Sequence, residues 1–198
     1  MLLTLHIHLL WLASRSHRVL EIDGSESFLR LHECIMEMRW LSGEHLWEFQ
    51  INRKIIINCP DFASDTVIDY SIYPKDLTAD LPTYLSPTLP LSDFLISQSS
   101  IKYIYDYGAN WTWTIACTDS EKDKKSDQPI VTYTKGRKIG EDLWGPEELA
   151  RLMSMLTTKQ FDPDVHETRN DFASEMECVS PYVLPVDGKL LVWQILCG

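Results

Sequence analysis

The strongest structural signal in the chain is IKYIYDYGANWTWTIAC, residues 101–117. Large side chains alternate on both sides of a short turn: Tyr103, Tyr105 and Tyr107 come before it, and Trp111, Trp113 and Ile115 follow it. A period of two residues predicts two strands that each have one apolar face. Gly-Ala-Asn at 108–110 predicts the turn between them. Since cross-strand aromatic pairs each contribute about 0.2–1 kcal/mol, we predict an antiparallel hairpin.

Further strands and helices are expected on both sides of this hairpin. Alternating apolar residues predict strands at residues 3–9, 18–22, 47–51, 55–57 and 130–134, with a hairpin that joins the third to the fourth. Apolar spacings of three and four predict helices over residues 26–38 and 146–156. A last helix is expected near Asp162, and a C-terminal hairpin over residues 186–196. Prolines at 60, 74, 82, 87 and 90 predict a long irregular connection over residues 60–92.

These elements predict an α+β fold, with a mixed, mostly antiparallel sheet and packed helices in a single compact domain. Strands and helices do not alternate regularly, which disfavours a doubly wound α/β fold. With 198 residues, of which 44% are hydrophobic, the chain is long enough to bury one sizeable core. We predict a domain over residues 1–176, and a C-terminal hairpin extension over residues 177–198 that packs on the same domain.

Charge and cysteine content bear on the partners and the compartment. A formal net charge of −11 repels phosphate backbones and anionic lipid, which disfavours nucleic acid and membranes as partners. Five cysteines without CxxC spacing favour reduced thiols and hence the cytoplasm. His6 and His8 interrupt the apolar N-terminal run, which favours a strand over a signal peptide. No run of about 18 apolar residues occurs, so no transmembrane helix is expected.

Three ordered blocks of sequence resemble the plasmid pRiA4b ORF-3-like family. They are LHECI at 31–35 with HLWEF at 45–49, YIYDYGANW at 103–111, and EDLWG at 141–145 followed by FDPD at 161–164. The resemblance implies a compact α+β domain with a mixed sheet. It implies no established activity, although some members carry resolvase labels or occur near mobile elements. The chain departs from the family pattern at Ala109, at Ile139-Gly140 and at Trp144, where the family has Asp, Pro-Pro and Gly.

The same blocks supply the candidate ligand-binding residues, which are His32, His45, Trp47, Tyr105, Asp106, Trp111, Glu141 and Asp142. Each has a structural alternative. His32 lies on an apolar helix face, where a histidine is often a core residue that is hydrogen-bonded to the backbone. The carboxylate of Asp106 is suited to cap the turn at Gly108. Glu141 and Asp142 are suited to oppose the dipole of the following helix.

We predict a non-enzymatic binding or accessory domain with an aromatic-lined groove between the 101–117 hairpin and the 26–38 helix. Seven tryptophans and eight tyrosines motivate this role, because such side chains dominate binding energetics. The partner would be a protein or a small ligand, and no cofactor or metal is predicted. One alternative is a metal-dependent hydrolase that uses His32, His45, Asp106 and Glu141. Another is a mobile-element-associated nucleic-acid-binding protein. No catalytic motif is recognisable, so an enzymatic role is the less favoured one.

Overall fold

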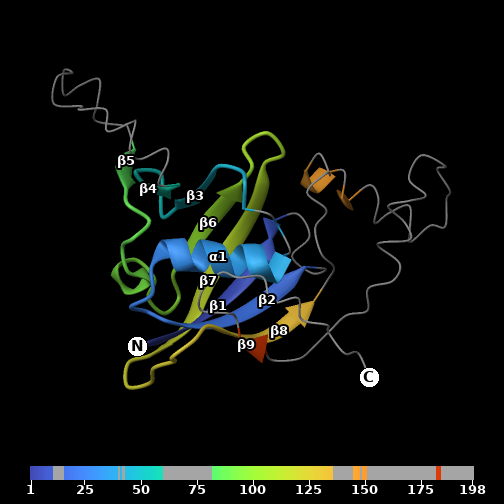
Figure 1. Cartoon of the computed structure of the whole chain (residues 1–198). Coiled ribbons are helices and arrows are strands. Elements are labelled where there is room, and N and C mark those ends of the chain that lie inside the picture. The colour runs from blue at the N-terminus through green and yellow to red at the C-terminus, as the bar shows by residue number, and fades with distance from the viewer. Residues whose placement is uncertain are drawn as a thin grey trace, which may run out of the picture.

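The computed structural model describes residues 1–10, 16–39, 41, 43–59, 82–135, 145–147, 149–150 and 182–183. Strands dominate these residues, together with one α-helix and one short 3₁₀ helix (Figure 1). In chain order the elements are β1 (Leu2–Leu9), β2 (His17–Asp23), α1 (Phe28–Arg39), β3 (Trp47–Gln50), β4 (Ile55–Asn58), β5 (Thr83–Leu85), η3 (Leu91–Asp93), β6 (Ser100–Tyr105), β7 (Trp111–Glu121), β8 (Ile130–Lys135) and β9 (Tyr182–Val183).

All the strands belong to one sheet in the order β5-β4-β3-β6-β7-β1-β2-β8-β9. Every neighbouring pair in the described sheet is antiparallel except β4 and β5, which run parallel. The first strand of the chain, β1, therefore lies inside the sheet, between β7 and β2. The prediction of a mixed, mostly antiparallel sheet is confirmed.

The aromatic hairpin forms where the sequence predicts it. Tyr103 of β6 pairs with Trp113 of β7, and Tyr105 pairs with Trp111. All four side chains are buried. Strand β3 continues the sheet beyond β6, with Phe49 opposite Tyr103. Alternate aromatic residues on three neighbouring strands therefore build one continuous apolar face.

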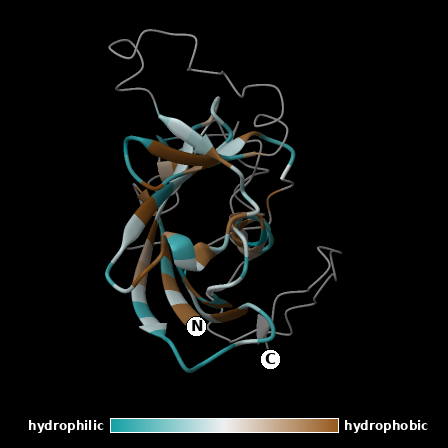
Figure 2. Ribbon diagram, turned by 90° about the vertical axis from the view of Figure 1, so that its left-hand side faces the viewer, coloured by the Kyte–Doolittle hydropathy of each residue, from teal (hydrophilic) through white to brown (hydrophobic). Residues whose placement is uncertain are grey.

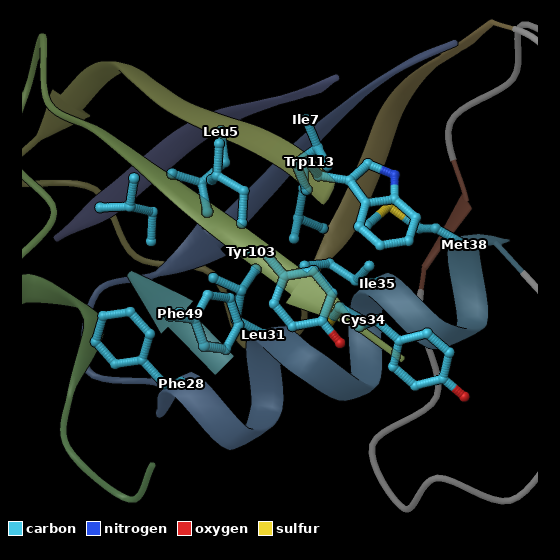
Figure 3. Close-up of a cluster of buried hydrophobic side chains, with 14 of the residues drawn as sticks. Leu5, Ile7, Phe28, Leu31, Cys34, Ile35, Met38, Phe49, Tyr103 and Trp113 are labelled. Carbon is cyan, nitrogen blue, oxygen red and sulfur yellow. The ribbon is translucent and has the colours of Figure 1, made fainter. Parts of the chain in front are cut away.

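Helix α1 covers this apolar face. Its N-cap is Ser27, whose Oγ accepts a hydrogen bond of 3.1 Å from the backbone N–H of Arg30. Figure 3 shows side chains of α1, Leu31 and Ile35 among them, packed in one cluster with Tyr103 and Trp113 of the sheet. Burying a large apolar side chain contributes about 1.5–3 kcal/mol, so the contact between α1 and the sheet is a main source of stability. Figure 2 shows α1 within the curve of the sheet.

The predicted α+β class with packed helices is wrong. The described residues form a large mixed sheet with one complete α-helix, α1, and no layer of several helices. The physical reason is that the sheet curves around α1 and supplies the apolar surface that further helices would have supplied (Figure 2). The 60–92 segment, predicted as irregular, contributes β5 and η3 in its described part.

The predictions for the residues after 145 can be compared with the structure only in part. Pro146, Glu147, Leu149 and Ala150 are helical, and the N–H of Leu149 donates to the carbonyl of Gly145 at 3.2 Å, so the helix predicted from Pro146 does begin there. The rest of that helix, the helix near residue 162 and the hairpin over 186–196 lie outside the described residues. Strand β9 pairs with β8, while the domain division at residue 176 stays a prediction.

Candidate functional site

His32 is a core residue of α1. Its side chain is 6% exposed, its Nδ1 shares a hydrogen bond of 2.7 Å with the hydroxyl of Tyr103, and its ring stacks on Trp47 with 4.2 Å between the centroids. Burial lowers the pKa of His32 from 6.5 to about 3, so the imidazole is neutral near pH 7. The structural alternative for His32 is therefore correct in kind, although its partner is a tyrosine side chain and not the backbone.

The aromatic candidates are buried as well. Trp47, Tyr105 and Trp111 are 3%, 1% and 1% exposed. The hydroxyl of Tyr105 accepts a hydrogen bond of 3.1 Å from the backbone N–H of Gly43, which connects the segment after α1 to the sheet. These rings stabilise the core, and their contact with a ligand stays a prediction.

Asp106 controls the turn between β6 and β7. Its backbone has φ 55°, the left-handed region, and its N–H donates to the carbonyl of Leu46 at 2.9 Å. Its Oδ1 accepts hydrogen bonds from the N–H groups of Gly108 at 3.0 Å and Ala109 at 3.3 Å. The interpretation of Asp106 as the carboxylate that caps this turn is confirmed.

The second carboxylate oxygen of Asp106 is directed to His45. The distance from Asp106 Oδ2 to His45 Nδ1 is 3.9 Å, too long for a hydrogen bond but short enough for an ion pair when the imidazole is protonated. The His45 side chain is 47% exposed, and its ring meets Tyr105 edge-on at 5.5 Å. The His45–Asp106 pair therefore lies at the surface, directly above the buried aromatic cluster.

The sequence blocks do approach one another. The first and second meet at His45 and Asp106, and the second and third meet at Ala109 and Gly145. Gly145 has φ 108°, and a Cβ placed on it would lie 2.2 Å from the carbonyl oxygen of Ala109. Only glycine allows this close approach of the two backbones. The two candidate residues of the third block, Glu141 and Asp142, lie outside the described residues.

A polar surface patch that includes residues of these blocks was not predicted from the sequence. The Tyr107 hydroxyl donates to Glu48 Oε2 at 3.0 Å, and the Gln50 amide donates to Glu48 Oε1 at 2.6 Å. Burial raises the pKa of Tyr107 above its usual value, and the charge of Glu48 and the neighbouring Tyr84 raise it further. Tyr107 and Tyr84 are nonetheless 45% and 42% exposed. We call Glu48, Tyr84 and Tyr107 the tyrosine–glutamate patch.

The missed signals can be named. The alternation in β3 correctly predicts that Glu48 lies on the face opposite Trp47 and Phe49, and this position could have indicated Glu48 as a surface site residue. Tyr107 was expected to share the inner face of the hairpin with Tyr103 and Tyr105. In the structure β6 ends at Tyr105, and the left-handed conformation of Asp106 directs the chain into the turn, which leaves Tyr107 at the surface.

A second group of side chains could hold a metal ion. His6 and His8 of β1 and His17 of β2 each offer one ligand atom, and these atoms all lie within 4.8 Å of one another. The His17 Nε2 and His6 Nδ1 atoms are 3.1 Å apart, and the rings of His8 and His17 stack at 4.1 Å. Sequence reasoning noted the His-x-His alternation but not the pairing of His8 with His17. We call these three residues the histidine cluster.

The structure defines a domain with a curved, mostly antiparallel sheet around helix α1. The family described as plasmid pRiA4b ORF-3-like protein matches residues 1–179. The chain therefore belongs to this family, as the sequence blocks predict.

One solved structure extends the comparison of the fold. The "Crystal Structure of Protein of Unknown Function MM3350 from Methanosarcina mazei Go1" has a TM-score of 0.64 and 17% sequence identity, and the match covers 91% of this chain and 92% of that chain. At this identity the likeness shows the fold alone. A search of the curated proteins found no match. Among the described residues, no helix has the length and apolar character needed to cross a membrane.

Proposed function

We propose that this chain is a non-enzymatic binding domain, and that its tyrosine–glutamate patch holds a cationic group, such as a Lys or Arg side chain of a partner peptide. Tyrosine faces attract cations within about 6 Å of the ring centroid, and a carboxylate adds direct charge complementarity. Both elements occur together in Glu48, Tyr84 and Tyr107. The patch thus has the chemistry for a basic ligand.

The observation that carries the proposal is the exposure of the two tyrosines. Tyr107, hydrogen-bonded to the Glu48 carboxylate, is 45% exposed, and Tyr84, close enough to act electrostatically on Tyr107, is 42% exposed, whereas Trp47, Tyr105 and Trp111 are no more than 3% exposed. Exposed tyrosines are typical of interface hot spots, because they combine a large apolar area with low conformational entropy. An aromatic binding surface is therefore better supported on the outer side of the turn than in a groove next to α1.

Charge supports a cationic partner. Asp106 precedes Tyr107 in the same turn and brings a second carboxylate, whose Oδ2 is shared only with His45 at 3.9 Å among the contacts described for it. The whole chain carries a formal net charge of −11, which attracts basic partners and repels acidic ones. Both the local and the overall field favour a basic ligand.

The hydrolase alternative has less support. It requires His32, yet that imidazole is buried, hydrogen-bonded to Tyr103 and stacked on Trp47. Burial also holds its pKa near 3, which is far from the range useful for proton transfer at neutral pH. Of the four residues in this hypothesis, His45 and Asp106 are the two that the described structure brings together.

The test is a binding titration with a defined probe. A fluorescein-labelled decapeptide of alternating Gly and Arg is titrated with the full chain, and a Gly–Glu decapeptide serves as the acidic comparison. Glu48→Gln and Tyr107→Ala are expected to weaken binding of the Gly–Arg peptide about tenfold each, since one cation–π or charge contact is worth about 1 kcal/mol or more.

The matched control is Glu121→Gln at the far end of β7. This variant removes the same single charge from an exposed carboxylate that pairs with Lys124, away from the patch. We expect it to change affinity by less than about twofold. Equal weakening by Glu48→Gln and Glu121→Gln would mean that only the overall charge acts, and the patch would lose its role.

A further inference from the structure

We propose that the histidine cluster of His6, His8 and His17 binds one divalent first-row transition metal ion on the sheet face opposite α1. The alternation of β1 sets this face, because Leu5 and Ile7 belong to the buried core, so that His6 and His8 project from the other side. The antiparallel register then places His17 of β2 directly opposite His8. Two neighbouring strands thus assemble three imidazoles without any loop residue.

The distances fit a metal site. Two nitrogens bound to one zinc ion at about 2.0–2.1 Å in tetrahedral geometry lie roughly 3.3 Å apart. His17 Nε2 and His6 Nδ1 are 3.1 Å apart, and the ligand atoms of all three residues lie within 4.8 Å of one another. The third imidazole would have to rotate so that its nitrogen moves by up to about 1.5 Å to reach the same spacing, which also separates the stacked rings of His8 and His17.

The ligand chemistry selects the type of metal. The cluster consists of imidazoles alone, which suit zinc, copper, nickel or iron and not the oxygen-seeking magnesium and calcium ions. Metal ions bind the neutral imidazole. Three protein ligands leave one coordination position for water or a small anion.

One buried atom also points to a missing partner. The Nδ1 of His8 is buried and has no hydrogen-bond partner in the structure. An unsatisfied buried polar atom is unfavourable, and a bound ion is one way to satisfy it. The ring of Tyr133 on β8 lies 5.1 Å from that of His17 and screens one side of the cluster. Lys135 of β8 lies opposite His17 in the β2–β8 register and is a charged residue next to the cluster.

The first experiment uses tag-free full-length chain and Co²⁺ as a spectroscopic probe, followed by displacement with Zn²⁺. A tetrahedral site gives intense visible absorption that saturates at one equivalent and disappears when zinc is added. Histidine C2–H resonances in the NMR spectrum are recorded in the same titration, and three of the six are expected to shift. Weak octahedral absorption, or no saturable binding, would overturn the proposal.

Variants then assign the ligands. His17→Gln and His8→Gln should each weaken Zn²⁺ binding by more than about 100-fold, since loss of a second-shell partner alone costs about 10- to 100-fold. His45→Gln is the matched control, an exposed histidine outside the cluster, and should retain wild-type affinity. Unchanged affinity in His17→Gln, or equal loss in His45→Gln, would overturn the assignment. Should a cluster variant fail to fold, the three shifted resonances of the wild-type chain decide the question.

Discussion

Acidification should destabilise this domain through His32 at a pH where most carboxylates are still ionised. The folded state holds the pKa of His32 at about 3, because the imidazole is buried, whereas the unfolded chain has the usual value of 6.5. Below pH 6.5 the unfolded state therefore binds a proton that the folded state does not. Stability from this group is complete above pH 6.5 and is lost as the pH falls toward 3.

The magnitude follows from the two pKa values. Each pH unit inside this window removes about 1.4 kcal/mol, so the loss between pH 6.5 and pH 5 is about 2 kcal/mol, and the full window removes about 4–5 kcal/mol. His6, whose pKa is also lowered by burial, adds a smaller effect of the same sign. The contribution of His6 is the same in the wild-type chain and in His32→Gln, so it cancels when the two are compared.

Urea unfolding at pH 7, 6 and 5 measures the effect. We compare the wild-type chain with His32→Gln, which cannot titrate, and with His45→Gln, which removes an exposed imidazole. The His32→Gln chain starts less stable at pH 7, but its free energy of unfolding should fall about 2 kcal/mol less than that of the wild type between pH 7 and pH 5. His45→Gln should keep the wild-type slope. Equal slopes for the wild type and His32→Gln would refute the reasoning.

Three further predictions concern the turn, the close approach of two backbones, and a buried thiol. Asp106→Ala should lower the free energy of unfolding by about 1–2 kcal/mol in urea titrations, and Asp106→Asn by clearly less, since asparagine can still cap the turn and adopt positive φ. Gly145→Ala should lower the melting temperature, because the added Cβ would clash with the Ala109 carbonyl and because the residue has a positive φ. The expected cost is about 1–3 kcal/mol. An unchanged melting temperature would contradict the packing described for this glycine. Burial raises the pKa of the Cys34 thiol, so this residue should resist iodoacetamide in the native chain and react after unfolding. Peptide mass spectrometry measures the labelling. If Cys34 in the native chain were labelled as fast as half-buried Cys59, the position of α1 would be contradicted.

The sequence predicted the local elements well because their signals are local. Period-two alternation located β1, β6 and β7, and spacings of three and four located α1. It could not predict that one helix is enough, because that depends on the curvature of a sheet assembled from distant strands. The pairing of β1 with β7 joins residues more than a hundred positions apart, for example Leu2 with Glu121, and no pattern in either strand specifies the other.

The candidate site shows the same division. Turn chemistry around Asp106 is local, and its cap was predictable from the sequence. The exposure of Tyr107 was not, because it depends on where β6 ends and on the left-handed conformation of one residue. The histidine cluster needs the register between β1 and β2, in which His8 faces His17. A His-x-His strand followed closely by another histidine is a signal that could have indicated it.

The position of β1 inside the sheet has a consequence for how the chain folds. The hairpin of β1 and β2 and the hairpin of β6 and β7 can each form from neighbouring segments, but β1 pairs with β7 along its whole length from Leu2 to Leu9. Joining the two hairpins closes the loop between the end of β2 at Asp23 and the start of β6 at Ser100, which is about 75 residues long, and this entropic step slows folding relative to local contacts. During synthesis, the edge of β1 that pairs with β7 therefore stays unpaired until the ribosome has released β7.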